Sequence, residues 1–137
     1  MTTVERRQLP QVRVLPRQAS AAPDARHFVV DVLKDWGLVG VLDDAAIVVT
    51  ELVTNAVQHT KTPTVRVIVR RMPADAVRLI VIDRHPEACP DIRTAGPLAT
   101  AGRGLAVVDA VAEGWGYTRW PWEKQVWADL STTGGRV

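Results

Sequence analysis

The chain has a single cysteine and no long hydrophobic segment. Its 137 residues include one cysteine, Cys89, which excludes an intrachain disulfide and a multi-cysteine metal site. No apolar run approaches the roughly 18 residues that a membrane-spanning helix needs. Residues 1–7 contain no apolar core and do not have the pattern of a signal peptide. We therefore expect a cytoplasmic protein without a membrane partner.

The chain also lacks a strong net charge and a run of basic residues. Lysine and arginine number 17 against 15 aspartates and glutamates, which gives a formal net charge of +2. The doublets Arg6-Arg7 and Arg70-Arg71 are its longest basic runs. Without a basic face or interleaved basic and aromatic residues, direct binding to nucleic acid is not expected. No cluster of His, Cys and Asp has the spacing of a zinc site.

What remains is the composition of one globular domain, with 47% hydrophobic and 23% charged residues. The length suffices for a single domain with its own core. Residues 1–10 are polar and end at a proline, and residues 132–137 contain two glycines. We predict that both segments are flexible tails. The folded domain is then expected over residues 11–131.

Apolar periodicity predicts an alternation of strands and helices. Strands are predicted at residues 12–15, 64–71, 76–83, 115–120 and 125–130, and helices at about 21–36, 42–60 and 105–111. Ser20 and either Asp43 or Asp44 are the predicted N-caps, and Gly37 is predicted to end the first helix. The short turn before residue 76 favours an antiparallel hairpin. The element order predicts an α+β two-layer sandwich, a mostly antiparallel mixed sheet covered on one face by three helices.

The helix predicted over residues 42–60 carries two polar side chains at the border of its apolar face. Glu51 and Asn55 are four residues apart and therefore lie on one stripe. Asparagine is a poor helix former and is rarely buried without a partner. Glutamate offers a carboxylate for proton abstraction, and asparagine offers a neutral oxygen to a hard cation. The alternative is a solvated helix edge, although the neighbours Ile47 and Leu52 make that placement awkward.

Two weaker signals accompany this helix. Gly102-Arg103-Gly104 precedes a helix, where free amides and glycines suit an anion, although turns use the same pattern. Asp83 ends an apolar strand, where a carboxylate is either a turn former or an acceptor for an exocyclic amine. It is followed by a long aperiodic segment, residues 84–101, and long loops in compact domains are usually functional or mobile.

In this order and spacing, the three features resemble the GHKL ATP-binding fold, the class of gyrase and sensor histidine kinases. The matching segments are residues 51–60 (ELVTNAVQHT), 102–105 (GRGL) and 126–130 (VWADL). More narrowly, the chain is similar to stand-alone anti-sigma factors that are also serine/threonine protein kinases. The resemblance runs from about residue 12 to residue 130 and implies the Bergerat-type ATP-binding fold.

The resemblance implies a role for each matching residue. Asn55 would hold the Mg²⁺ that bridges the ATP phosphates, and Glu51 would be the general base for a partner's hydroxyl or would position it. Asp83 would bind the adenine amino group. The segment Gly102-Arg103-Gly104-Leu105 would receive the terminal phosphates, and residues 84–101 would form the ATP lid.

Two further residues are secondary candidates in the same pocket. His59 lies two turns beyond Glu51, where packing and a ribose-side role are both open. Gln125 stands in the last hairpin, where the family usually has a hydroxyl near the adenine.

The resemblance also implies partners. The chain would use ATP and Mg²⁺ to phosphorylate a small anti-anti-sigma protein of the STAS type, and would bind that protein, a sigma factor or both. An edge strand at residues 12–15 leaves a homodimer through sheet pairing open.

Two departures from the family motivate a second hypothesis. The family usually continues from its adenine aspartate as Asp-x-Gly-x-Gly, whereas this chain reads DRHPE over residues 83–87. The last hairpin usually carries Gly-Lys/Thr-Thr, whereas this chain has Glu123-Lys124-Gln125. Bulkier residues narrow the pocket, and Pro86 stiffens the entrance to the lid. The alternative function is therefore a catalytically weak or inactive protein-binding module of the same fold.

Four tryptophans gather in the last hairpin. Trp115 and Trp127 alternate with apolar strand residues and are expected in the core. Trp120 and Trp122 flank the turn, where they are candidates for a partner surface.

Overall fold

The computed structural model describes residues 9–84 and 102–132 of the chain. Its elements are β1 (Gln11–Pro16), α2 (Ala21–Asp35), a single 3₁₀ turn (Val39–Val41), α3 (Leu42–His59), β2 (Thr64–Met72), β3 (Ala76–Arg84), α5 (Gly102–Val111), β4 (Gly114–Trp120) and β5 (Glu123–Ser131). The predicted tails, residues 1–10 and 132–137, and the predicted lid, residues 84–101, fall for the most part outside the described residues. Within the described ranges, no helix is long and apolar enough to cross a membrane.

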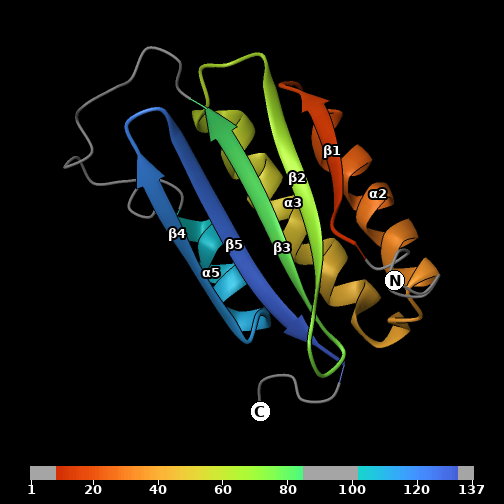
Figure 1. The fold of residues 1–137 in the computed structure, drawn as a ribbon. Helices are drawn as coiled ribbons and strands as arrows, with labels where there is room; N and C mark the ends of the chain where they lie inside the picture. The colour runs from red at the N-terminus through yellow and green to blue at the C-terminus, as the bar shows by residue number, and fades with distance from the viewer. Residues whose placement is uncertain (1–8, 85–101, 133–137) are drawn as a thin grey trace.

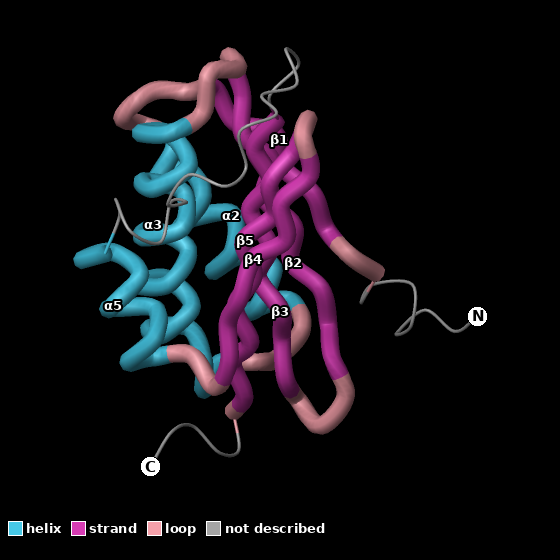
Figure 2. The backbone as a smooth tube through the Cα atoms, turned by 90° about the vertical axis from the view of Figure 1, so that its left-hand side faces the viewer, coloured by secondary structure: helices cyan, strands magenta, loops and turns pink. Residues whose placement is uncertain are grey.

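The five strands form one sheet in the order β1-β2-β3-β5-β4. All four pairings between described strands are antiparallel, and β2 and β3 form the predicted hairpin. Helices α2, α3 and α5 lie together on one face of the sheet, and none of the described helices lies on the other face (Figures 1 and 2). The predicted α+β two-layer sandwich is therefore confirmed. We call the helix-free side of the sheet the open face.

The core lies between the sheet and the helices. Alternate residues of the two central strands face the helices and are fully or almost fully buried: Val65, Val67, Val69, Val77, Leu79 and Val81. They pack against aliphatic side chains of α2 and α3 that include Val29, Leu33, Val48 and Leu52. Burying one such side chain stabilises a fold by about 1.5–3 kcal/mol, so this layer supplies most of the driving force for folding.

The predicted end of α2 is confirmed. Gly37 adopts a left-handed conformation with φ of 77° and donates its N–H to the carbonyl of Lys34 at 3.0 Å. The N–H of Leu38 reaches back to the carbonyl of Leu33 at 2.9 Å. These two bonds make a Schellman motif, which satisfies carbonyls that the helix itself leaves unpaired.

Ser20 is the N-cap of α2, as predicted, whereas the predicted N-cap of α3 is wrong. Ser20 precedes α2, but its backbone is already helical and its side chain makes no capping bond. Its hydroxyl instead accepts a hydrogen bond from Nε2 of Gln18 at 2.7 Å. At α3 the preceding 3₁₀ turn makes Val41 the N-cap and moves Asp43 and Asp44 into the first turn. There both carboxylates still favour the positive end of the helix dipole.

The tryptophans divide between the two faces. Trp115 packs against the core as expected, and its Nε1 donates to Oδ1 of Asp109 at 2.9 Å. The expected core position of Trp127 is wrong, because this side chain lies half-buried beneath the guanidinium of Arg78 on the open face. It fills the space above Gly116, where a Cβ would lie 2.8 Å from its ring. Trp120 and Trp122 are exposed, as predicted.

Candidate functional site

Five polar or charged side chains are buried in the described part of the chain, and they gather at one end of the sandwich. They are Asn55, Thr60, Thr62, Asp83 and Lys124. The end of α3, the end of β3 and the beginning of β5 come together there (Figure 1). Burying polar groups is unfavourable unless they are paired or bind something. This end of the molecule is therefore the candidate site.

Asp83 and Lys124 form an ion pair inside the site. They are directly opposite each other on β3 and β5, and 3.5 Å separates Nζ of Lys124 from Oδ2 of Asp83. Both residues are almost completely buried, with exposed fractions of 2% and 3%. Burial lowers the pKa of the Lys124 ammonium by more than the charge of Asp83 raises it, and Arg119 lowers it further. The two charges remain inside the protein because each neutralises the other.

Sequence reasoning missed Lys124 as a site residue. The signal was nevertheless present, because Val126, Ala128 and Leu130 alternate on β5 and face the helices. Counting back by two from Val126 places Lys124 on the same face. Gln125, the secondary candidate, is therefore on the open face, and its Nε2 donates to Oε2 of Glu123 at 3.1 Å. The structure does not bring Gln125 to the other candidate residues.

Helix α3 carries Glu51, Asn55 and His59 at intervals of four residues, one above another on its surface. Asn55 is buried, and its Oδ1 has no hydrogen-bond partner among the described residues. Glu51 is half-buried and lines a shallow cavity of about 280 Å³ together with Arg26 and Thr50. The glutamate thus reaches a surface that another molecule can approach, whereas the asparagine faces the interior.

His59 lies at the end of α3, close enough to the ion pair for both of its charges to affect the pKa of the imidazole. Burial lowers the pKa of the imidazole, and the positive charge of Lys124 lowers it further. The negative charge of Asp83 opposes both effects. The structure therefore brings together His59, Asp83 and Lys124, from three different elements.

The Gly102-Arg103-Gly104 segment forms the first turn of α5 instead of preceding the helix. Amides in the first turn of a helix have no partner within the helix and favour an anion. Leu105 is buried in the core, where it anchors this turn. The side chain of Arg103 and the predicted lid are outside the described residues.

The donor atoms of the site suit a hard cation such as Mg²⁺. No group of three or more His, Cys, Asp or Glu that would hold a metal exists in the described ranges. Mg²⁺ does not need one, because it keeps several waters and takes few protein ligands. The buried Oδ1 of Asn55, which has no hydrogen bond from the described residues, fits the oxygen ligand that Mg²⁺ requires.

Comparison with known proteins agrees with this geometry. The model of the family described as histidine kinase-, DNA gyrase B-, and HSP90-like ATPase matches residues 40–136, a range that contains every candidate residue. The chain is also similar to the crystal structure of the RsbU and RsbW domains of Rv1364c from Mycobacterium tuberculosis, with a TM-score of 0.68 and 20% identity. The similarity covers 89% of this chain and 32% of the other, so the chain spans about a third of that structure's length. Among curated proteins, none matches significantly.

Proposed function

Because the chain belongs to the family of histidine kinase-, DNA gyrase B- and HSP90-like ATPases, we propose that its buried polar end binds ATP with Mg²⁺. The observation that carries the proposal is the concentration of the buried polar side chains at this one end. Thr60 and Thr62 hydrogen-bond to each other. At the other three positions, Asn55, Asp83 and Lys124, a core under selection for stability alone would contain aliphatic residues. ATP presents an amine, a triphosphate and a bound cation, which match the groups of this site.

Each group has one expected role. The carboxylate of Asp83 accepts a hydrogen bond from the adenine amine, and the Oδ1 of Asn55 is a ligand of Mg²⁺. The amides of the Gly102-Arg103-Gly104 segment face the phosphates, where the helix dipole favours negative charge. Mg²⁺ supplies charge neutralisation for the triphosphate.

Replacing the carboxylate of Asp83 by an amide tests whether this side chain binds adenine. In Asp83→Asn, calorimetric titration should show ATP affinity reduced by roughly tenfold or more, because the amide turns an acceptor into a donor. Asp35→Asn, which changes an exposed carboxylate at the end of α2, is the matched control. Unchanged ATP affinity in folded Asp83→Asn protein would remove Asp83 from the site.

We further propose that the ATP is used to phosphorylate a serine or threonine of a small anti-anti-sigma protein of the STAS type, with a sigma factor as the second partner. The hydroxyl oxygen attacks the γ-phosphorus, the bond from phosphorus to the β–γ bridging oxygen breaks, and ADP leaves. Glu51 accepts the hydroxyl proton. Its half-buried carboxylate beside an accessible cavity supports this role, because a partner side chain can approach it.

Transfer of labelled γ-phosphate to a purified STAS-type protein tests this step. Glu51→Gln should lower the rate by about 10²–10⁴-fold, the usual contribution of a general base, and should leave ATP affinity unchanged. Asp44→Asn, an exposed carboxylate in the first turn of the same helix, should transfer phosphate at the wild-type rate. Transfer by Glu51→Gln at the wild-type rate would contradict the assignment.

One observation favours the second candidate function, a protein-binding module with weak or no catalysis. Lys124 already pairs with Asp83, so the adenine amine must compete with an ammonium group for the carboxylate. In Lys124→Thr, which offers a hydroxyl in place of the ammonium, ATP should bind more tightly than in the wild type. If folded wild-type protein binds no ATP at millimolar concentration while it still binds a protein partner, the module is the correct function.

A further inference from the structure

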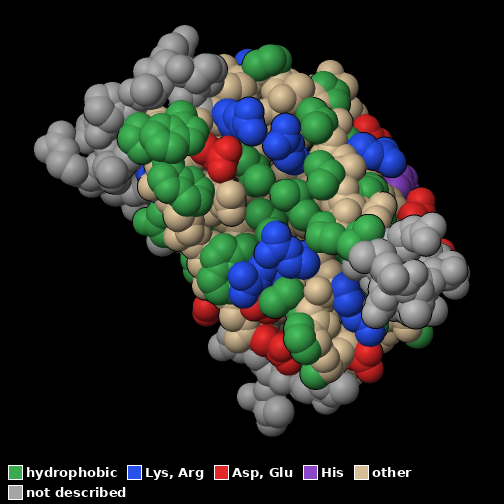
Figure 3. Space-filling model, viewed as in Figure 1, with side chains coloured by type: hydrophobic (Ala, Val, Ile, Leu, Met, Phe, Trp, Pro, Cys, Tyr) green, Lys and Arg blue, Asp and Glu red, His purple; other side chains and the backbone are tan. Residues whose placement is uncertain are grey.

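The open face of the sheet combines exposed apolar side chains with a row of arginines. Four apolar residues at its margins have exposed fractions between 36% and 56%: Val12, Val14, Trp120 and Trp122. In the space-filling view, apolar and basic side chains lie side by side over the strands (Figure 3). Isolated surface hydrophobics need no explanation, but a group of them on one face marks a candidate interaction site.

The arginines of this face carry more positive charge than the face itself neutralises. They are Arg66 and Arg70 of β2 and Arg78 and Arg84 of β3. Arg78 pairs with Asp129 at 2.7 Å, and Arg84 with Glu123 at 3.4 Å. Among the described residues, Arg66 and Arg70 have no carboxylate partner. The open face therefore offers two guanidinium groups to a negatively charged molecule.

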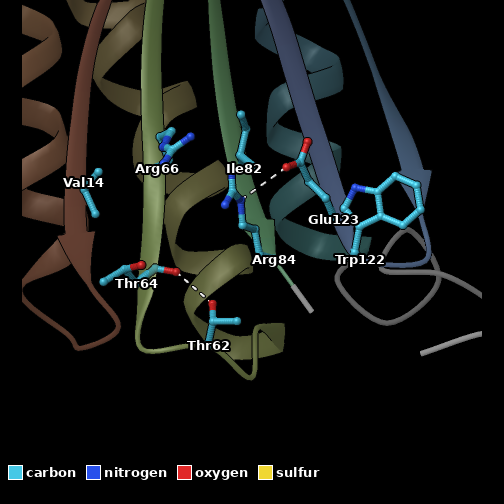
Figure 4. A pocket seen from close by; sticks show the side chains of 8 residues that line it. All are labelled: Val14, Thr62, Thr64, Arg66, Ile82, Arg84, Trp122 and Glu123. Carbon is cyan, nitrogen blue, oxygen red and sulfur yellow. Dashed lines mark hydrogen bonds and ion pairs between the residues drawn. The ribbon is translucent and has the colours of Figure 1, made fainter. Parts of the chain in front are cut away.

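A cavity of about 480 Å³ lies on this face, at the end of the sheet where β3 stops and β5 starts. Its lining includes Val14, Arg66, Ile82, Arg84, Trp122 and Glu123. Val14 and Trp122 stand on opposite sides of the cavity, with Arg66, Ile82 and Arg84 between them (Figure 4). The cavity thus has an apolar side chain on each side and, between them, Ile82, Arg66 and the ion pair of Arg84 with Glu123.

This cavity lies directly behind the candidate ATP site. Successive residues of a strand point to opposite faces, so Asp83 and Lys124 face the helices. The next pair in the register, Arg84 and Glu123, faces the cavity. The two sites share the same strand ends and the side chain of Thr62, which is buried at this end of the sandwich and also lines the cavity.

We propose that the open face is a docking surface for a segment of another protein that carries carboxylates between apolar side chains. Carboxylates match the free guanidinium groups of Arg66 and Arg70, and arginine binds carboxylates with two parallel hydrogen bonds. The walls formed by Val14 and Trp122 accept apolar side chains. Tryptophan and arginine are also the residues that most often dominate the binding energy of interfaces.

The charges of the face argue against a second copy of this chain as the occupant. In a two-fold dimer, each subunit uses the same patch, so the arginine row would lie against itself. Like charges brought together in an interface disfavour association. A negatively charged partner removes this repulsion, and the proposal does not depend on ATP binding.

The test uses synthetic peptides and the full chain. A fluorescein-labelled peptide in which glutamates alternate with leucine and phenylalanine should bind, as measured by anisotropy, and should shift the amide resonances of β1, β2 and β3. Versions with lysine for glutamate, or with serine for the apolar residues, should bind at least tenfold more weakly. Added salt should weaken the binding of the glutamate peptide, because its charges are exposed.

Single substitutions test whether the peptide binds at the open face. Arg66→Glu and Trp122→Ala should each weaken binding of the glutamate peptide by tenfold or more. Lys34→Glu makes the same charge change at an exposed position of α2, and Val39→Ala truncates an exposed apolar residue away from the sheet. Both control variants should bind like the wild type. Asp83→Asn should also bind the peptide normally, which separates this surface from the ATP site.

Three results would overturn the proposal. The first is absence of peptide binding to the wild type, and the second is equal weakening by Arg66→Glu and Lys34→Glu. The third is a wild-type dimer in sedimentation that Arg66→Glu dissociates, because the occupant would then be a second copy.

Discussion

The two faces of one sheet differ although the same strands build them. On the helix-covered face, strand residues are mostly aliphatic, and the ion pair of Asp83 and Lys124 is buried among them where β3 ends and β5 begins. On the open face, arginines, carboxylates and tryptophans alternate with those aliphatic residues. Most side chains of the covered face stabilise the fold, and the buried ion pair is the exception that calls for a functional explanation. The open face combines valines and isoleucines with arginines and tryptophans, and the last two residue types are enriched at interfaces.

The ion pairs of the two faces show the same contrast. Asp83 and Lys124 are shielded from water, with side-chain exposures of 1% and 3%, whereas Arg78 and Asp129 are exposed by 28% and 26%. The guanidinium of Arg78 donates two hydrogen bonds to Asp129, at 2.7 and 2.9 Å, and lies 4.3 Å from the ring centre of Trp127. This bond geometry raises the pKa of Arg78, while burial lowers that of Lys124. Arg78 and Asp129 pair through two well-aligned hydrogen bonds, whereas Asp83 and Lys124 must pair because both charges are buried.

The largest effect is expected from breaking the buried pair. Lys124→Met should lower the free energy of unfolding by about 3–5 kcal/mol, because Asp83 would remain as an uncompensated buried charge. In the double variant Lys124→Met/Asp83→Asn most of this loss should be recovered. Urea denaturation of the three proteins measures the effect. A loss below about 1 kcal/mol in the single variant would mean that water reaches Asp83.

A valine-to-alanine pair compares the two faces directly. Val67 is completely buried under the helices, and Val14 is 50% exposed on the open face. Val67→Ala should lower the free energy of unfolding by about 2 kcal/mol through lost burial and a new cavity. Val14→Ala should change it by less than about 0.5 kcal/mol. Equal losses in urea denaturation would show that the open face also contributes to the core.

A double-mutant cycle on Arg78 and Asp129 measures the half-exposed pair. Their coupling free energy should be about 1 kcal/mol, the upper end for pairs in contact with solvent, because the contact is bidentate. High salt should reduce this coupling. A coupling close to that of the buried pair would remove the contrast between the two faces.

The smallest effect is a pH dependence from His59. Its folded-state pKa lies below its unfolded value, so the unfolded chain binds more protons in the range just below the ordinary histidine pKa. The free energy of unfolding should therefore fall as the pH drops below about 6.5 and recover above it. His59→Gln should show a smaller change over the same range. Identical pH profiles for the two proteins would show that His59 is not perturbed.

The order of strands and helices was predictable because periodicities of two and 3.6 residues directly report a buried face. The end of α2 was predictable because Gly37 supplies a left-handed residue. The start of α3 was not, since the 3₁₀ turn before it depends on how Leu38 and Val41 pack in the core.

In the candidate site, the sequence pattern pointed to Asn55 and Asp83 but not to Lys124. Residue type explains the difference, because lysine is usually an exposed residue and only the pairing of β3 with β5 places it opposite Asp83. The same strand places Gln125 on the opposite face, away from the site. Cross-strand register between segments far apart in sequence depends on tertiary packing, which local patterns do not report.

The most direct test of the proposed site is the Mg²⁺ dependence of ATP binding. Calorimetric titration should detect binding of Mg-ATP to the wild type, and either chelation of Mg²⁺ or Asn55→Ala should weaken it by roughly tenfold or more. Gln58→Ala, an exposed amide on the same helix, should bind like the wild type. If folded Asn55→Ala protein binds Mg-ATP as tightly as the wild type, Asn55 does not hold the cation and the account of this site is wrong.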